Sequence, residues 1–242
     1  MDFEITYIAE TDSTNRWMKE HGGERDAVVW ADYQTAGRGC GTNTWESERG
    51  RNLLFSVLVH PKNVPATTQF ILSMANALAL KEALDTYVDG VKIKWPNDIY
   101  WLDKKISGTL IETTLQGSII KTCIIGTGLN VNQWRFDSDA PNPVSLCQIL
   151  QHEVSLEEVR QRILSSMTKC LTMVKDGSWD AIRTNYHANL YRKEEIHGYR
   201  FTDGTSRQCR LIGVTDDGHL ELEEAKGKEL YSLTFKEVQF II

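Results

Sequence analysis

Short apolar segments divided by turn residues, between residues 91 and 125, constrain the fold of this chain most strongly. The segments with strand character are Val91–Trp95, Ile99–Trp101, Thr109–Leu115 and Ser118–Ile125. The turns expected among them are Pro96-Asn97-Asp98, Asp103-Lys104-Lys105 and Gln116-Gly117. Strands joined by such short turns pair in opposite directions. We therefore predict a largely antiparallel sheet in the middle of the chain.

The other segments before residue 190 add strands and helices to this sheet. Strand patterns occur at Phe3–Ile8, Ala27–Tyr33 and Asn52–Val59. Helical patterns occur at Asn15–Glu20, which follows possible N-cap residues at 11–14, and at Thr67–Tyr87, Leu156–Val174 and Trp179–Leu190. This mixture predicts an α+β fold, in which a mixed, largely antiparallel sheet is covered by helices.

The tail from Lys193 onward has a different pattern from the rest of the chain. It consists of short strand patterns with hairpin signals at Asp203-Gly204, Asp216-Asp217-Gly218 and Lys226-Gly227. Such a pattern is typical of a small β-barrel. We therefore predict two domains, a large one at residues 1–190 and a small barrel at 191–242.

Composition excludes several classes of protein. The 242 residues include 27 lysines and arginines against 33 acidic residues, a net charge of −6 without a block of like charge, so binding of duplex nucleic acid or an anionic membrane is not expected. No segment offers the long uncharged apolar run of a membrane helix, and no apolar leader follows Met1. The five cysteines form no C-x-x-C pair, which argues against a disulfide scaffold or a cysteine zinc site and predicts a reducing cytoplasm.

A glycine-rich loop at residues 36–42 could hold an anion. Gly37, Gly39 and Gly41 alternate around Arg38, so backbone amides could approach a phosphate or carboxylate while the guanidinium supplies charge. The dinucleotide fingerprint needs a helix after the glycines, whereas a strand pattern follows here, and no P-loop motif occurs. A mobile surface loop is the alternative interpretation.

Two further motifs carry polar side chains. Lys94 to Asp98 and Asp103 to Gly108 place a carboxylate and a lysine on two turns joined by a short strand, where they could face one pocket. The alternative is a hairpin with solvated lysines, in which Trp95 is only a core residue. The motif from Gly126 to Asn132 could hold a polar group or a hydrated metal, or it could be a bulged edge strand.

Histidine chemistry finds little support in the sequence. None of the six histidines lies near the candidate loops along the chain, and both H-E-x-x-H and G-x-S-x-G are absent. A hydrolase triad is therefore difficult to build, and the histidines are interpreted as surface or helix-end residues.

Taken in order, these strings resemble the biotin protein ligase (biotin–acetyl-CoA-carboxylase ligase) family. The resemblance covers the large domain and rests on Asp12 to Asn15, Gln34 to Gly39, Trp45, Lys94 to Asp98, Lys105 to Gly108 and Gly126 to Asn130. It implies a biotin/lipoate-ligase fold, related to class II aminoacyl-tRNA synthetases, with a C-terminal SH3-like barrel. Longer family members begin with a DNA-binding helix-turn-helix, and this chain begins at the first strand, so a ligase without repressor function is expected.

The resemblance implies a two-step protein biotinylation. Biotin attacks the α-phosphate of MgATP to give biotinyl-5′-AMP and pyrophosphate, and a lysine of a biotin carboxyl carrier domain then attacks the mixed anhydride. ATP, Mg²⁺ and biotin are thus the implied small molecules, and the carrier domain of a biotin-dependent carboxylase is the implied protein partner. A monomer or a weak homodimer is expected.

The resemblance also implies roles for individual residues. The implied catalytic residues are Arg38 and Lys105, which bridge the biotin carboxylate and the α-phosphate, and Asp98, which orients the acceptor lysine. The implied biotin-binding residues are Ser13, Thr14, Asn15, Gln34, Gly37, Arg38, Gly39, Lys105 and Gly108. The implied ATP and adenylate residues are Arg38, Gly39, Cys40, Trp45, Lys105 and Asn130. No side-chain metal cluster is expected, since Mg²⁺ would arrive with ATP and lie near Asn130.

One departure from the family pattern affects the glycine-rich loop. Family members usually continue with basic or polar residues after Gly39, whereas Cys40-Gly41-Thr42 follow here. Fewer charge-assisted bonds would then close the loop, so we expect the adenylate to be held less tightly. Asn43, Arg49 and Arg51 could supply the missing donors.

Two alternatives to a biotin ligase stay open at this point. A lipoate or octanoate ligase shares the fold and also makes an acyl-adenylate, but its acid has no ureido ring. A non-catalytic biotin-binding sensor would keep the pocket and lose the chemistry. In the ligase reading, a carrier domain is expected to dock by pairing with an exposed strand edge, which could also serve self-association.

Overall fold

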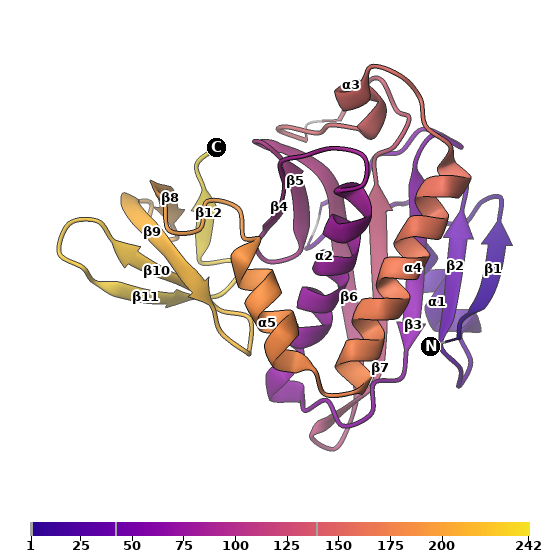
Figure 1. Ribbon diagram of the computed structural model, residues 1–242, viewed down its shortest axis with the longest axis horizontal. Coiled ribbons are helices and arrows are strands. Elements are labelled where there is room, and N and C mark those ends of the chain that lie inside the picture. Colours follow the sequence, from indigo (N-terminus) through magenta and orange to yellow (C-terminus); the bar gives the residue numbers. More distant parts are fainter. Residues whose placement is uncertain (1, 42, 139) are drawn as a thin grey trace.

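Two β-sheets organise the molecule (Figure 1). The computed structural model describes residues 2–41, 43–138 and 140–242. The larger sheet has seven strands in the order β1-β2-β3-β7-β6-β5-β4. Its strands are β1 Glu4–Ile8, β2 Ala27–Ala31, β3 Leu53–Val59, β4 Val91–Lys94, β5 Asp98–Trp101, β6 Lys104–Gln116 and β7 Ile119–Leu129. All neighbouring pairs are antiparallel except β1 with β2, so the predicted mixed, largely antiparallel sheet is confirmed.

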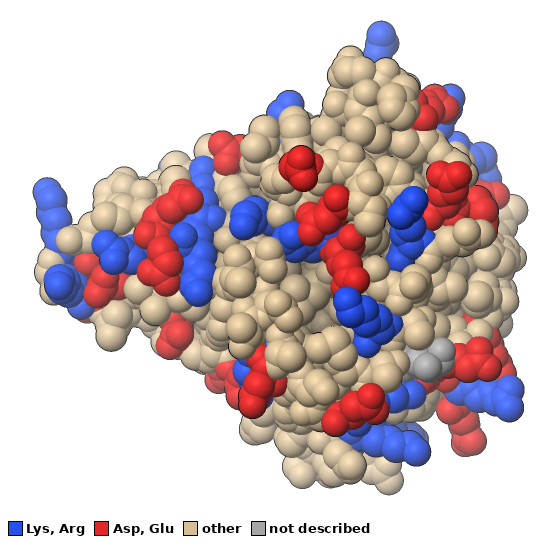
Figure 2. Space-filling view, in the orientation of Figure 1, with Lys and Arg blue, Asp and Glu red and all other residues tan. Residues whose placement is uncertain are grey.

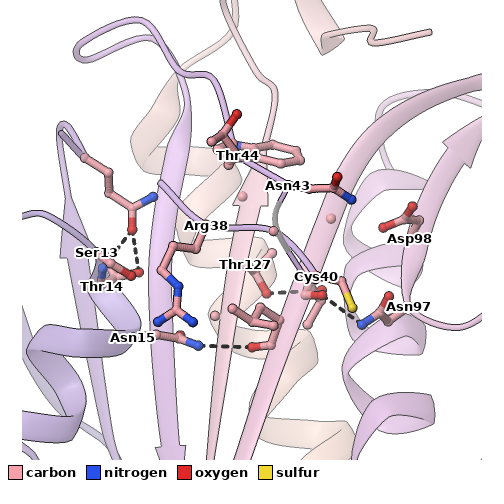
Figure 3. A pocket seen from close by; sticks show the side chains of 18 of the residues that line it. Ser13, Thr14, Asn15, Arg38, Cys40, Asn43, Thr44, Asn97, Asp98 and Thr127 are labelled. Carbon is pink, nitrogen blue, oxygen red and sulfur yellow. Dashed lines mark hydrogen bonds between the residues drawn. The ribbon is translucent and has the colours of Figure 1, made fainter. Parts of the chain in front are cut away.

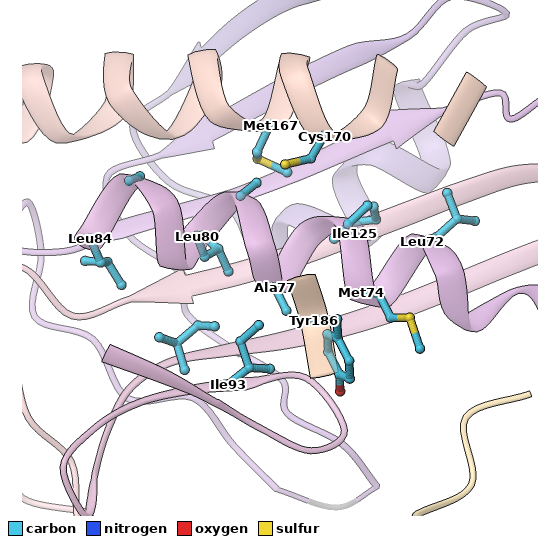
Figure 4. Close-up of a cluster of buried hydrophobic side chains, with 14 of the residues drawn as sticks. Leu72, Met74, Ala77, Leu80, Leu84, Ile93, Ile125, Met167, Cys170 and Tyr186 are labelled. Carbon is cyan, nitrogen blue, oxygen red and sulfur yellow. The ribbon is translucent and has the colours of Figure 1, made fainter. Parts of the chain in front are cut away.

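Three helices cover one face of the large sheet (Figure 1). They are α2 Phe70–Leu84, α4 Leu156–Lys175 and α5 Trp179–Ala188. Helix α2 lies in the middle, and 11 of its 15 residues are buried, because it packs against the sheet as well as against α4 and α5. Figure 4 shows Leu80 and Met74 of α2 in this core, with Met167 of α4 and Tyr186 of α5.

The opposite face of the sheet carries helix α1 and the loops of the candidate site. Helix α1, Thr14–His21, contacts β3 and β7. Its N-cap residue is Ser13, as the sequence predicts, but the Ser13 side chain makes no capping hydrogen bond. The Ser13 hydroxyl therefore remains available to the pocket described below.

The C-terminal region forms the second sheet, with the strand order β11-β10-β9-β8-β12. Its strands are β8 Ile196–Phe201, β9 Ser206–Val214, β10 Leu220–Glu224, β11 Leu230–Leu233 and β12 Val238–Phe240. The predicted hairpin glycines Gly204, Gly218 and Gly227 all have positive φ, a conformation that glycine adopts without steric cost. The small antiparallel sheet agrees with the SH3-like barrel expected from the sequence.

Contacts join the C-terminal sheet to the large sheet. The indole N–H of Trp95, at the end of β4, donates to the Gly218 carbonyl at 2.9 Å, and Arg183 of α5 pairs with Asp216 at 2.6 Å. Residues Asn189 to Tyr191 pair with Ile93 and so cover the outer edge of β4. The division of the chain at residue 190 remains a prediction.

Some predicted boundaries were wrong in instructive ways. Lys104 and Lys105 belong to β6 and not to a turn, because β6 begins directly after Leu102-Asp103 and pairs with β5 along Lys104 and Lys105. The expected long helix from Thr67 divides into a 3₁₀ turn at Ala66–Thr68 and α2. The sequence analysis missed α3, Leu146–Leu150, although Ser145 and Gln148 form a capping box there.

The visible surface is electrostatically mixed. Figure 2 shows basic and acidic side chains interspersed over this face of the molecule. Among the described residues, no helix combines the length and apolarity needed to cross a membrane.

A half-buried ion network fastens three elements at one end of the large sheet. The Asp26 carboxylate accepts from Lys175 Nζ at 2.7 Å and from the His60 backbone N–H at 2.8 Å. Burial raises the pKa of Asp26, but the hydrogen bonds from Lys175 and His60 outweigh burial and hold it below the ordinary 3.8. The carboxylate therefore stabilises the fold where it is ionised.

We expect Asp26→Asn to lower the free energy of unfolding by about 2 kcal/mol at neutral pH, because it removes a charged hydrogen-bond acceptor. A carboxylate whose pKa is lower in the folded state than in the unfolded state stabilises the fold at a pH above its unfolded-state pKa. This stabilisation disappears as the pH falls through the folded-state pKa. Urea denaturation should therefore show the difference between wild type and variant shrinking below pH 3.8. Glu82, which forms an exposed ion pair with Lys169, provides the control. Glu82→Gln should lower the free energy of unfolding by less than about 1 kcal/mol. Equal effects at both sites would contradict this assignment.

Candidate active site

A pocket opens on the α1 face of the large sheet, with a volume of about 140 Å³. We call it the first pocket. It is lined by Ser13, Thr14, Asn15, Gln34, Arg38, Gly39, Cys40, Asn43, Thr44, Trp45, Asn97, Asp98, Lys105, Gly108, Thr109, Leu110, Gly126, Thr127, Gly128 and Phe235. Segments far apart in the sequence therefore meet here, including most of the residues singled out in the sequence.

The floor of the first pocket is bare backbone of β6 and β7. A Cβ at Gly128 would lie 2.3 Å from the Trp45 indole, and one at Gly126 would lie 2.0 Å from Asn15 Oδ1. At Gly108 a Cβ would meet Lys105 Nζ at 2.9 Å. These three glycines let Trp45, Asn15 and Lys105 approach the sheet directly, which a larger residue would prevent.

A polar wall stands on one side of this floor. Gln34 Oε1 accepts from the backbone N–H of Thr14 at 2.7 Å and from its hydroxyl at 3.0 Å. Ser56 Oγ on β3 lies 2.8 Å from Thr14 Oγ1 and 2.7 Å from Asn15 Oδ1. Asn15 Nδ2 donates to Glu112 at 2.8 Å. Asn15 is thus fully engaged within the protein, and Ser13, Thr14 and Gln34 provide the polar atoms nearest the cavity.

Arg38 supplies positive charge in the middle of the first pocket. Figure 3 shows its side chain between Ser13 and Thr14 on one side and Asn97 and Asp98 on the other. Within the described part of the chain, no carboxylate lies in salt-bridge range of Arg38. The guanidinium therefore keeps its donors for an anion.

The glycines next to Arg38 shape its loop. Trp45 N–H donates to the Gly37 carbonyl at 2.9 Å, and Gly39 N–H donates to the Asn43 carbonyl at 2.8 Å. Gly37 has no room for a side chain, because a Cβ there would lie 2.5 Å from the Trp45 carbonyl oxygen. Gly37 thus shapes the loop that carries Arg38, whereas Gly39 also lines the pocket.

Lys105 and Asp98 form an ion pair on neighbouring strands. Lys105 Nζ lies 2.8 Å from Asp98 Oδ1, and the side chains are 32% and 19% exposed. The same ammonium stands 5.7 Å from the centroid of the Trp45 ring. The antiparallel pairing of β5 with β6 brings these two charges together, so the predicted meeting of a carboxylate and a lysine in one pocket is confirmed.

A second pocket adjoins the first. Its lining comes mainly from the loop after β7 together with β5 and β6, and consists of Asn43, Thr44, Trp45, Glu46, Asp98, Tyr100, Lys105, Asn130, Phe136, Ser138, Ala140, Pro141, Asn142 and Pro143. Lys105, Asp98 and Trp45 line both pockets. A molecule in each pocket would therefore meet its neighbour beside Lys105.

Glu46 joins the two loops that enclose the second pocket. Its carboxylate accepts from the backbone N–H groups of Asp137 and Ser138, each at 2.9 Å. Burial raises the pKa of Glu46, and the hydrogen bonds from Ser138 and Asp137 more than offset it, so the pKa is lowered. Burial also raises the pKa of Tyr100 to about 12, so its hydroxyl stays protonated at neutral pH.

Oxygen donors in the second pocket suit Mg²⁺. Asn130 is buried, its Nδ2 donates to the Val144 carbonyl at 3.1 Å, and its Oδ1 has no hydrogen-bond partner among the described residues. Glu46 and Asp98 line the same pocket, and amide and carboxylate oxygens are ligands that Mg²⁺ prefers. No group of three or more metal-ligating side chains occurs in the part of the chain that the structure describes. A cation here would therefore take its remaining ligands from the oxygens of a bound polyphosphate.

Most residues predicted for the site lie together. Arg38, Gly39 and Cys40 line the first pocket, and Asn130 lines the second. Cys40 is half-buried, whereas the other four cysteines are buried. Thr42, named with Cys40 in the loop, lies outside the described residues.

The sequence analysis missed several lining residues. Asn97 and Thr127 lie within motifs it had noted, so proximity to Asp98 and Gly126 could have indicated them. Phe136 and Tyr100 line the second pocket without a motif to mark them. Phe235 comes from the C-terminal sheet, and no signal in the sequence brings that sheet to the pocket.

Known proteins resemble this chain in sequence and in fold. The bifunctional ligase/repressor BirA of Bacillus spizizenii is 29% identical over 241 residues, covering 93% of this chain and 70% of the relative. Human biotin–protein ligase is 25% identical over 224 residues, covering 85% of this chain and 29% of the relative. A structure of Aquifex aeolicus biotin protein ligase with biotin and ATP superposes with a TM-score of 0.80 at 24% identity, covering 98% and 99% of the two chains.

The family model for the biotin/lipoate A/B protein ligases matches residues 7–130, slightly more than half of the chain. The matched region contains the polar wall, the glycine floor, Arg38 and the Lys105–Asp98 pair, and ends at Asn130. By this match over more than half of its length, the chain belongs to the biotin/lipoate A/B protein ligase family.

Proposed function

We propose that this protein is a biotin–protein ligase, which activates biotin with MgATP and transfers it to a lysine of a biotin carboxyl carrier domain. The observation that carries the proposal is the junction of two pockets at Lys105, with the guanidinium of Arg38, which has no acidic partner among the described residues, in the first. The names of the curated relatives support the same activity.

Biotin fits the first pocket with its two polar ends apart. The ureido ring would bind Ser13, Thr14 and Gln34, whose donors and acceptors complement a neutral ring with N–H and C=O groups. The Gly108 amide would also contact the ligand. The carboxylate would then reach Arg38 and Lys105.

ATP fits the second pocket. Its adenine would pack against Trp45, and its phosphates would extend toward Lys105 and Asn130. Asn130, whose Oδ1 has no hydrogen-bond partner among the described residues, would help to hold Mg²⁺, which would supply charge neutralisation. Gly39 and Cys40 line the first pocket, where they would contact the adenylate.

The first step joins two anions. An oxygen of the biotin carboxylate attacks the α-phosphorus, the bond to the bridging oxygen breaks, and pyrophosphate leaves with its electron pair. Fixed cations in a partly dry site lower the repulsion between the carboxylate and the phosphate. Arg38 and Lys105 are placed to hold both groups, which makes them the proposed catalytic residues.

The second step needs a neutral amine. The acceptor lysine attacks the biotinyl carbonyl carbon, the bond to the AMP oxygen breaks, and the amine loses a proton. Asp98 lies beside Lys105 and is 19% exposed, so it can orient the incoming ammonium and relay its proton. This is the proposed role of Asp98.

Biotin is favoured over lipoate by the polar wall. Both acids belong to the family's chemistry, but a ureido ring could hydrogen-bond to the polar wall of Ser13, Thr14 and Gln34, whereas the apolar end of lipoate would cover these polar groups without bonding them. Leaving such atoms unpaired costs about 1–3 kcal/mol each, which disfavours an apolar acid. A non-catalytic sensor would not need the Lys105–Asp98 pair.

Further features of the proposal concern assembly. We assign residues 1–190 to a catalytic domain and 191–242 to the SH3-like domain. The protein is expected to act as a monomer or a weak homodimer, without nucleic acid.

The direct test is the intact mass of an apo carrier domain after incubation with this protein and MgATP. We expect one mass addition with biotin and none with lipoate or octanoate.

Lys105→Gln should reduce biotin-dependent pyrophosphate–ATP exchange by about 100-fold or more, because it removes a charge that acts at the reacting atoms. The neighbouring Lys104, exposed on β6, is the matched control, and Lys104→Gln should leave exchange unchanged. Biotin binding without exchange in the wild type would establish the sensor instead.

Cys40 lines the pocket where family members usually carry a basic or polar residue, so we propose that the adenylate escapes readily. Cys40→Arg should slow release of biotinyl-5′-AMP about tenfold, since one charge-assisted hydrogen bond is worth roughly 1.5–3 kcal/mol. Release is measured by trapping free adenylate from a preformed complex, with Cys40→Ser as the uncharged control. Slow release from the wild type, unchanged in Cys40→Arg, would rule out this idea.

The open edge of β6 is the proposed docking site for the carrier. β5 pairs with β6 only as far as Ser107, and the Asn97 side chain caps the Thr109 carbonyl at 2.8 Å. The Ile106 carbonyl accepts from Asn130 on the β7 side, so by alternation the N–H groups of Ile111 and Thr113 point away from β7. This edge continues directly from the pocket floor, and a carrier strand paired here would lie next to the site.

We expect Thr113→Pro to raise the KM for the carrier about tenfold while adenylate formation stays unchanged, because proline removes the outward N–H without breaking the β7 ladder. Thr113→Val keeps that N–H and serves as the control. The measurement compares pyrophosphate exchange with carrier biotinylation. If transfer by Thr113→Pro equals that of the wild type, the carrier docks elsewhere.

A further inference from the structure

Phe235 carries the C-terminal sheet into the first pocket. It lies between β11 and β12, lines the first pocket together with Asn97 and Asp98, and is 43% exposed despite its apolar ring. Phe235 is not among the described residues that line the second pocket. An exposed aromatic ring that lines the same pocket as a carboxylate is a suitable surface for a chain with an apolar stem and a cationic end.

The turn that presents Phe235 is closed by hydrogen bonds. Glu237 Oε2 accepts from the Thr234 N–H at 2.7 Å and from its hydroxyl at 2.8 Å, and the Glu237 N–H donates to the Thr234 carbonyl at 3.0 Å. The Thr202 N–H donates to the Glu237 carbonyl, which ties the turn to the end of β8. Phe235 is therefore held by a defined turn within the barrel.

Trp95 fixes this turn relative to Asp98. The Trp95 and Phe235 ring centroids lie 6.1 Å apart, and the Trp95 indole also binds the Gly218 carbonyl of the barrel. The Gly218 turn packs tightly on Phe70 of α2, where a Cβ would lie 2.7 Å from the ring. Trp95 is three residues before Asp98, so one short segment connects the barrel contact with the carboxylate.

On the basis of the proposed ligase function, we propose that Phe235 is a specificity-determining residue for the acceptor lysine. In the proposed function, the polar wall binds the ureido ring of biotin, Arg38 and Lys105 bind its carboxylate, and the second pocket binds adenine. The side chain that must still reach Asp98 is the lysine, with four methylene groups and an ammonium. The stem would lie along the Phe235 ring, and the ammonium would reach Asp98.

The test separates acylation of the carrier from formation of the adenylate. Phe235→Ala should lower kcat/KM for carrier biotinylation about tenfold, mainly through KM, by analogy with the truncation of an aromatic contact. Biotin-dependent pyrophosphate–ATP exchange and biotinyl transfer to hydroxylamine, a nucleophile without a methylene stem, should fall much less than carrier transfer. Phe235→Tyr should restore carrier transfer. Leu230→Ala, at an exposed barrel position, should leave every readout unchanged.

The outcomes distinguish this inference from the proposed function. Absence of pyrophosphate exchange in the wild type would refute the ligase proposal itself. If Phe235→Ala reduces exchange as much as carrier transfer, the ring acts on biotin or ATP and the inference is wrong. It is equally wrong if the hydroxylamine reaction falls with carrier transfer, or if carrier transfer is unchanged.

Discussion

The bare backbone of β6 and β7 is the constraint on which the site depends. Gly108, Gly126 and Gly128 leave no side chain above the sheet, so Lys105 and Trp45 pack directly on the floor. The absence of Cβ atoms at these three positions is what lets Asn15, Trp45 and Lys105 lie against the strands and surround the pocket. On their other face, Thr109 of β6 accepts from Asn76 of α2 at 3.1 Å, and Ile125 of β7 lies in the same core as α2.

The chemistry follows from where charges are left unpaired. Arg38 has no acidic partner among the described residues, whereas Lys105 shares Asp98, and the three groups stand around the junction of two pockets. A reaction between a carboxylate and a phosphate needs fixed positive charge, and the following aminolysis needs a carboxylate near the nucleophile. One small region can therefore serve both proposed steps, with the barrel completing its rim through Phe235.

Much of this arrangement could be predicted, because the motifs are local. Three short motifs each place polar side chains or glycines within a few residues of one another. They are the Gly-Arg-Gly loop, Lys94–Asp98 and Gly126–Asn130. The errors came where pairing across the sheet overrides local preference. Lys105 was predicted in a turn, yet it lies in β6 because β5 offers a partner strand and because the Asn142 carbonyl accepts from its backbone N–H. Helix α3 was missed in the stretch between Val144 and Leu156, for which no element was predicted.

By itself, the sequence determined the α+β class, the small C-terminal barrel and the motifs from which most residues of the first pocket come, because turn residues, hydrophobic period and motif order are features of short stretches of chain. Only the tertiary structure decided that the Asn15 side chain is hydrogen-bonded to Ser56 and Glu112, that Lys105 lines two pockets, and that Phe235 lines the first of them. These facts depend on contacts between residues far apart in sequence. Such contacts are set by how the two sheets pack, and no local pattern encodes that packing.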